Sequence, residues 1–191
     1  MNKSAYYNNL IKTVIDSSDA TTWEDAVQEW EISDCDEDEE HESSCICGKE
    51  NLRYLFTISN IHNHNTLFPI GSSCIKKFGC TNLTTIASLR EQLFKLLHAI
   101  ENESYILLSR EYFSRELLRW LHEYDAFPPN CYNRNAPEND YQFLLDMFNK
   151  RNKNSITQAQ NSKINAIIIH SIKPFLLNFL KNKIKRKNTN E

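Results

Sequence analysis

Glycine is scarce in this chain: its 191 residues contain three, and each lies within three residues of a cysteine. Gly48 directly follows Cys47, and Gly71 precedes Cys74 by three positions. Glycine is needed where the backbone takes a positive φ or passes close to another group. Its restriction to the neighbourhood of thiols predicts that the backbone here wraps around a bound metal ion.

The chain also lacks a long apolar run. Residues 1–10 contain no hydrophobic signal region, and the most apolar stretch, 164–180, is interrupted by His170, Lys173 and Pro174. We therefore expect no secretory signal and no membrane span. The expected location is the cytoplasm of a host bacterial cell, where clustered thiols bind metal more often than they form disulfides.

The charge is divided unevenly along the chain. The overall formal charge of −3 combines −11 in residues 1–50 with +8 in residues 51–191. Seven of the nine residues in 34–42 are acidic, and five bases lie within 181–187. Runs of one charge sign are typical of solvated segments, and both are also candidate surfaces for a charged partner.

The segment that follows the paired cysteines has the pattern of a β-hairpin. Residues 52–60 are aromatic and β-branched, residues 66–70 are a second apolar run, and the asparagines between them favour a turn. Ser72 or Ser73 is the expected cap of a short helix that carries Cys74 and ends at Gly79.

The remainder shows helical spacing of apolar residues. A helix capped by Thr21 or Thr22 is expected to reach Trp30, and Pro174 is expected to kink the last helix. The acidic run 34–42 predicts an exposed loop. The other predicted helices cover 4–15, 83–101, 104–124, 137–151 and 155–186.

These patterns predict a mainly α protein with a small zinc-bound β-hairpin, in the α+β class. The expected parts are an N-terminal helical segment (1–33), a zinc-binding hairpin module with an acidic loop (34–82) and a C-terminal helical domain with a basic tail (83–191).

The metal site is predicted from the course of the hairpin. Cys45 and Cys47 lie on a tight turn before the first strand, and Cys74 follows the second strand. Because the two strands of a hairpin run in opposite directions, Cys74 returns to the pair. Thiolates are preferred ligands of Zn²⁺, so we expect one structural zinc ion. The alternative is a set of buried free thiols, since cysteine is common in protein cores.

The fourth ligand is less defined. His62 and His64 lie at the hairpin tip, roughly 25–30 Å from the paired cysteines at about 3.3 Å per residue, so they cannot share the ion. His41, four residues before Cys45, is the preferred choice. The alternatives are Cys80, Cys35 and the distant His98, His122 and Cys131.

A paired-cysteine turn, a hairpin and a ligand at a helix start resemble the treble-clef class of zinc folds. That class takes two ligands from the helix, whereas here the residue three after Cys74 is Lys77. Residues 23–80, with Cys45-Ile-Cys-Gly-Lys49 and Pro69-Ile-Gly-Ser-Ser-Cys74-Ile-Lys-Lys-Phe78, resemble small phage and prophage zinc proteins. Residues 141–151, followed by 156–158 and 163–164, are similar to the tails of those proteins.

The resemblance implies a function through binding rather than catalysis: inhibition of a type II CRISPR effector. The implied partner is a host protein or nucleoprotein, Cas9 or Cas9 with its guide RNA, which the acidic segment 34–42 would engage. The second hypothesis is a nucleic-acid-binding protein of phage replication or expression that uses the basic C-terminal region, with Lys76 and Lys77 near the metal.

The third hypothesis is a metal-dependent nuclease. Residues 62–65, His-Asn-His-Asn, invite comparison with nucleases of the ββα-metal type. In those enzymes the catalytic and metal-binding residues are spread over a hairpin and a helix, which four adjacent turn residues do not reproduce. No phosphate-binding loop or nucleophile motif is present, so we expect no enzymatic activity.

Overall fold

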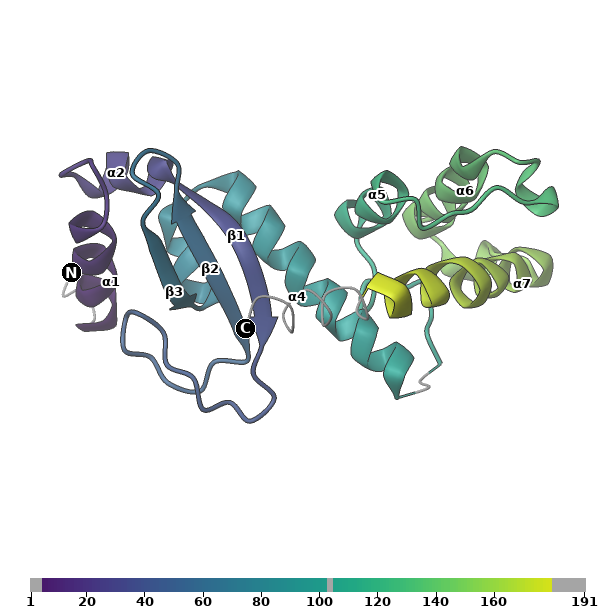
Figure 1. Ribbon diagram of the computed structural model, residues 1–191. Coiled ribbons are helices and arrows are strands. Elements are labelled where there is room, and N and C mark those ends of the chain that lie inside the picture. The colour runs from purple at the N-terminus through teal and green to yellow at the C-terminus, as the bar shows by residue number, and fades with distance from the viewer. Residues whose placement is uncertain (1–4, 103–104, 180–191) are drawn as a thin grey trace. The chain divides into compact units, whose positions relative to one another are not determined.

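A computed structural model describes residues 5–102 and 105–179. They form two compact units, which divide between Glu91 and Gln92 (Figure 1). The N-terminal unit contains α1 (Ala5–Asp16), α2 (Trp23–Ala26), β1 (Trp30–Glu37), β2 (Tyr54–Asn60), β3 (Thr66–Ile70), α3 (Ser72–Ile75) and the first part of α4 (Thr81–Glu101). The C-terminal unit contains the rest of α4, α5 (Arg115–Glu123), α6 (Pro137–Asn149) and α7 (Gln158–Ile167).

Short 3₁₀ turns join several of these elements, at Val27–Glu29, Lys76–Phe78, Cys131–Asn133 and Lys153–Ser155. Helices predominate and the strands form one small sheet, so the α+β class is confirmed. Within the described residues, every helix is either too short or too polar to cross a membrane.

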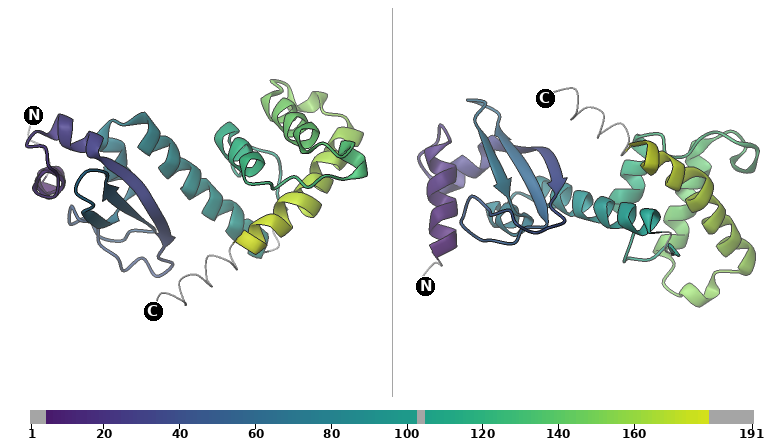
Figure 2. Two further views of the ribbon diagram at one scale, coloured as in Figure 1. Left: turned by 45° about the horizontal axis from the view of Figure 1, so that its top comes forward. Right: turned by 60° about the horizontal axis from the view of Figure 1, so that its bottom comes forward.

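The sheet is antiparallel, with the strand order β1-β2-β3. The predicted hairpin is confirmed as β2 and β3, which pair from Ser59 opposite Thr66 to Phe56 opposite Ile70. Figure 2 shows the same three strands from two further directions. The end of β3 therefore lies beside the start of β2, as the predicted return of Cys74 to Cys45 and Cys47 requires.

Two predictions for the region of strand β1 are wrong. The helix expected to reach Trp30 ends earlier, and the acidic run is extended through Glu37 instead of being a loop throughout. Cys35 is 2% exposed and pairs with Phe56 of β2, which fixes this segment in the sheet. The register shifts between Ile32 and Asp34, and the side chain of Asp34 is exposed. Acidic residues can thus occupy a strand whose inward positions are apolar.

The core of the N-terminal unit combines the sheet with the helices around it. α1 contributes Leu10 and Val14, which have no exposed surface, and the expected helix over 4–15 is confirmed for the described residues. Burial of each large apolar side chain contributes roughly 1.5–3 kcal/mol. The largest fully buried side chains of this unit are Leu10, Phe56, Ile58, Ile70 and Ile75.

A helix predicted over 104–124 is confirmed only in its second half. α5 begins after Ser114, whose hydroxyl accepts a hydrogen bond from the backbone N–H of Leu117 at 3.0 Å. This serine cap, together with a turn in which the N–H of Phe113 donates to the carbonyl of Ser109 at 2.9 Å, separates the loop from the helix. Leu107, which lies within the helix predicted over 104–124, is 52% exposed.

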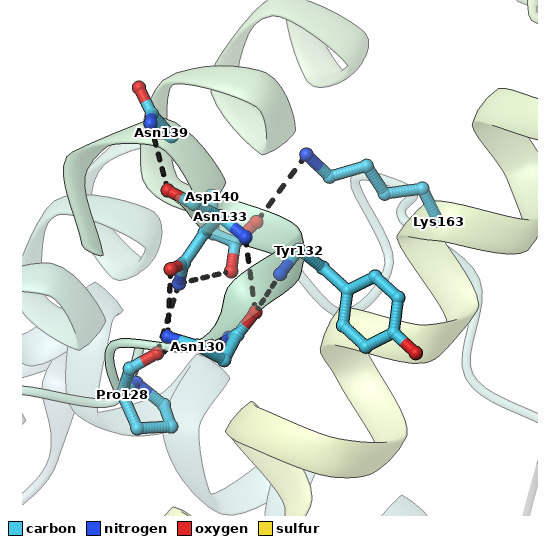
Figure 3. Close-up of polar contacts among 7 residues, drawn as sticks. All are labelled: Pro128, Asn130, Tyr132, Asn133, Asn139, Asp140 and Lys163. Atoms are coloured by element: carbon cyan, nitrogen blue, oxygen red, sulfur yellow. Dashed lines mark hydrogen bonds and ion pairs between the residues drawn. The ribbon is translucent and has the colours of Figure 1, made fainter. Parts of the chain in front are cut away.

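The loop before α6 is held by a buried polar network (Figure 3). The amide of Asn133, 1% exposed, donates to the Asp140 carboxylate and to the Pro128 carbonyl, both at 2.9 Å. Lys163 of α7 approaches the other oxygen of Asp140 at 3.5 Å. Pro137 begins α6 as expected, and these contacts connect the loop with α6 and α7.

The last described helix changes its winding before Pro174. Residues Ile168–Ile172 form a π-helical turn between α7 and helical residues 173–179. Proline cannot donate a backbone hydrogen bond, so a local change of winding before it is the expected form of the predicted kink. The remainder of the predicted helix and the basic tail 181–187 lie outside the described residues.

The tip of the β2–β3 hairpin is fixed by a buried carboxylate. Glu29, 6% exposed, accepts hydrogen bonds from the side chain of Asn60 at 2.6 Å and from the N–H groups of Asp19 and Ala20 at 2.9 and 2.7 Å. Burial raises the pKa of Glu29, but these hydrogen bonds outweigh burial, and with a smaller contribution from His62 they lower the pKa below its ordinary value.

We predict that Glu29→Gln destabilises the protein at neutral pH, because an amide N–H would then face one of the backbone donors. A lowered folded-state pKa contributes stability above the unfolded-state pKa, and this contribution is lost as pH falls through the folded-state value. The difference in melting temperature from wild type should therefore be largest near pH 7 and shrink in acid. Thermal melts from pH 7 to 3 measure it, with Glu31→Gln on exposed β1 surface as the control; a difference independent of pH would contradict the prediction.

Candidate metal centre

The first two cysteines lie on a tight backbone turn. The N–H of Gly48 donates to the carbonyl of Cys45 at 2.7 Å, and the N–H of Cys45 donates to the carbonyl of Lys49 at 2.8 Å. Gly48 has a φ of 90°, which is accessible to glycine and strained for other residues. The turn places Cys45 and Cys47 with both sulfur atoms directed into the protein, at 4% and 1% exposure.

The third cysteine arrives through the end of β3. The N–H of Ile46 donates to the carbonyl of Pro69 at 2.9 Å and joins the cysteine turn to this strand. α3 then begins after Gly71, which is the N-cap in place of the expected Ser72 or Ser73. A Cβ atom at Gly71 would lie 2.9 Å from a methyl group of Leu52, so a larger residue here would require the Leu52 side chain to shift. The helical turns end at Gly79 with a φ of 71°, as predicted.

The three sulfur atoms lie close together. Cys74 Sγ lies 3.7 Å from Cys45 Sγ and 3.5 Å from Cys47 Sγ, and all three atoms lie within 4.8 Å of one another. With Zn–S bonds of about 2.3 Å, the sulfur atoms of a tetrahedral site are about 3.8 Å apart. The spacing and the donor type therefore fit a zinc ion that Cys45, Cys47 and Cys74 would hold.

The cluster also favours a thiolate. The pKa of Cys45 is lowered to about 5, first by a hydrogen bond with Cys74 and also by the N–H of Gly71, 3.4 Å from Cys45 Sγ. The pKa of Cys74 is raised by its hydrogen bond with Cys45, by burial and by the neighbouring negative charge. The negative charge of the first thiolate thus opposes ionisation of a second thiol. A bound divalent cation would remove this opposition.

The other candidate ligands lie outside this group of three sulfur atoms. His41 is exposed, in a loop where its N–H donates to Asp38 at 3.0 Å. The Cys80 thiol faces the carbonyl of Val27 at 3.6 Å, and the Cys35 thiol faces that of Asp36 at 3.8 Å. His62 and His64 follow β2 at the opposite end of the hairpin from Cys74, in agreement with their exclusion on geometric grounds.

A cleft of about 180 Å³ borders on the cluster. Cys45 and Cys74 form part of its wall, together with Ser72, Ser73 and Lys49. Among the described histidine, cysteine and acidic residues, none joins the three sulfur atoms as a fourth neighbour. The fourth position of a tetrahedral ion therefore requires His41 to move, another ligand to approach, or a water molecule to enter.

One supporting contact was not indicated by the sequence. The side-chain amide of Asn9 in α1 donates to the carbonyl of Cys47 at 3.3 Å, and Tyr6 lies 3.9 Å from the Cβ position of Gly48. α1 therefore packs on the outside of the cysteine turn. The helical spacing of residues 4–15 identified the helix, but nothing in that pattern indicated which segment it would cover.

Comparison of the chain with models of protein families, with curated proteins and with solved structures finds no match.

We predict that the purified protein binds one zinc ion per chain and that Cys47→Ser lowers the melting temperature by roughly 10 °C or more, because metal binding and folding are coupled. Elemental analysis and thermal melts in zinc-containing buffer measure both effects. Cys131→Ser is the matched control, since Cys131 is exposed and belongs to the C-terminal unit. If purified wild-type protein contains no metal and Cys47→Ser melts at the wild-type temperature, the cysteines are free core thiols.

We predict that His41→Ala weakens zinc affinity by about tenfold or more if His41 is the fourth ligand, since loss of one of four ligands removes a coordinate bond. Competition with a chromophoric chelator measures the affinity, and Cys80→Ser and Cys35→Ser are compared in the same assay. Unchanged affinity of His41→Ala together with a loss in either cysteine variant would reassign the ligand.

Proposed function

We propose that this chain is a zinc-binding protein that acts by binding another macromolecule. The observation that carries the proposal is the contact of three buried cysteine sulfur atoms where the hairpin returns to the cysteine turn. A zinc ion there would supply a cross-link between two backbone segments: the turn of Cys45 and Cys47, and α3, which carries Cys74 directly after β3. Such a role is structural, and the surface it fixes becomes the functional part.

Acidic side chains dominate one edge of this surface. Glu37 forms an ion pair with Arg53 at 2.8 Å, and Asp38 accepts hydrogen bonds from Ser43 N–H and Oγ at 2.8 and 2.6 Å. The hydrogen bonds with Ser43 lower the pKa of Asp38. These two residues shape β1 and the loop after it. The remaining exposed acids of the segment are Asp34, Glu39, Glu40 and Glu42.

The charge of this segment favours a partner with a basic surface. We propose that the partner is a type II CRISPR effector, Cas9 or Cas9 with its guide RNA, which holds nucleic acid in a positively charged channel. This choice of partner rests on the resemblance to phage zinc proteins. The acidic edge supports it by supplying the complementary charge.

The hairpin tip favours a binding role over a nuclease. Asn63 Nδ2 donates to the carbonyl of Ser17 and to Asp19 at 3.2 and 2.9 Å, and Asn65 Nδ2 donates to the same carbonyl at 3.1 Å. The asparagines of residues 62–65 thus fasten the hairpin turn to the turn after α1. These hydrogen bonds give the two asparagines a structural role in the fold.

We predict that the protein inhibits DNA cleavage by Cas9–guide complexes and that Glu39→Lys/Glu40→Lys weakens inhibition by about tenfold or more, because charge reversal places like charges across the interface. Cleavage assays over a range of inhibitor concentrations measure the effect. The control, Glu101→Lys/Glu123→Lys, makes the same change of charge on exposed sites of the C-terminal unit.

Two results would count against this proposal. Full cleavage at all inhibitor concentrations, with no capture of Cas9 by the zinc-loaded protein, would remove Cas9 as the partner. Equal inhibition by the reversal variant and its control would retain Cas9 and remove the acidic edge as the contact surface.

A further inference from the structure

A large groove lies within the C-terminal unit, separate from the cysteine cluster. Its volume is about 1140 Å³, and its walls come from the loop before α5, the end of α6 with the residues that follow, and α7. This exceeds the usual range of roughly 300–1,000 Å³ for small-molecule pockets. The size is suited to an extended ligand that follows a groove.

The groove is strongly basic. Glu116 is the one acidic residue among its lining residues, against five cations: Arg110, Arg115, Lys150, Arg151 and Lys153. Arg110 and Arg151 are exposed and form no ion pair among the described residues. Unneutralised charge of one sign along a groove raises the local concentration of an oppositely charged ligand.

Other cations of the groove are held in place by the fold. Lys153 Nζ donates to the carbonyls of Met147 and Phe148 at 2.8 and 2.6 Å, at the C-terminal end of α6. Arg115 Nε donates to Asn149 at 2.7 Å. Burial lowers the pKa of Lys153, and the nearby positive charge of Arg110 adds a smaller effect in the same direction. Lys153 and Arg115 therefore have defined positions before any ligand binds.

The groove also presents an exposed aromatic ring. Tyr105 is 72% exposed, yet its hydroxyl accepts a hydrogen bond from Asn165 Nδ2 at 3.3 Å, so the ring has a defined position at the groove wall. Amide side chains of Gln92, Asn149 and Asn161 lie along the same groove. An aromatic face beside cations and amides can stack a base, contact phosphates and bond to base edges.

We propose that this groove binds single-stranded nucleic acid, with Arg110 and Arg151 at phosphates and Tyr105 stacked on a base. The proposal does not depend on zinc or on the acidic edge of the N-terminal unit. It assigns nucleic-acid binding to the groove, whereas the sequence pointed to the basic tail and to Lys76 and Lys77.

Binding is tested by fluorescence anisotropy with labelled 12-nucleotide oligo-dT and oligo-U at several salt concentrations. Arg110→Ala/Arg151→Ala should weaken affinity about tenfold at low salt and reduce the slope of log affinity against log salt by about 1.4, since each lost single-strand phosphate contact removes about 0.7. The control, Arg119→Ala/Lys173→Ala, removes the same charge outside the groove lining and should retain wild-type affinity and slope.

A second pair of variants tests stacking without a change of charge. Tyr105→Leu should weaken binding by about tenfold with the salt slope unchanged, because stacking contributes little to counterion release. Tyr132→Leu is the matched control, since Tyr132 is 87% exposed in the same unit and does not line the groove. Circular dichroism of each variant identifies any loss of folding.

Three outcomes would overturn the proposal. The first is no binding of either oligonucleotide at 50 mM salt. The second is equal affinity of the groove variants and their controls, with loss of binding only in a full-length Lys185→Ala/Arg186→Ala/Lys187→Ala variant, which would assign binding to the tail. The third is equal affinity for heparin, double-stranded DNA and the single strands, which would show a general polyanion surface.

Discussion

The pairing of β2 with β3 is the constraint on which the candidate metal centre depends. Cys45 and Cys74 are 29 residues apart, and their sulfur atoms are 3.7 Å apart because the hairpin returns the chain to its starting point. Two local contacts complete the closure: the hydrogen bond from Ile46 to Pro69 and the approach of Leu52 to Gly71. A change of pairing by one residue would move these contacts to the other face of the sheet. Register and metal geometry are therefore set together.

The cysteine cluster could be predicted because its parts lie within one short segment. The antiparallel strands of a hairpin bring the two ends of that segment together. Strand length, an asparagine-rich turn and glycine within three residues of Cys45, Cys47 and Cys74 together specified where Cys74 would arrive. The fourth ligand could not be predicted in the same way. The position of His41 depends on the acidic loop, whose course is set by hydrogen bonds from the backbone to Asp38 and not by any periodic pattern.

The strand β1 and the basic groove show where sequence patterns fail. In β1 the apolar residues Trp30, Ile32 and Cys35 do not alternate strictly with polar residues, because the register shifts between Ile32 and Asp34. The acidic residues of the same segment favoured the interpretation as an exposed loop. Beside the groove, the apolar spacing over 104–124 fitted one helix, although the helix α5 begins only after its cap, Ser114. Groove walls come from segments distant in sequence, which no single pattern unites.

The opposite charges of the two units impose a requirement on any partner. The acidic residues of β1 and its loop would attract a basic surface, and the basic groove proposed in the C-terminal unit would attract phosphates. A protein with a basic surface would satisfy the first attraction, and a nucleic acid would satisfy the second. A nucleoprotein satisfies both, because it offers basic protein surface and nucleic-acid backbone in one particle. The two proposals, although independent, therefore favour the same class of target, and a guide-loaded effector is a member of that class.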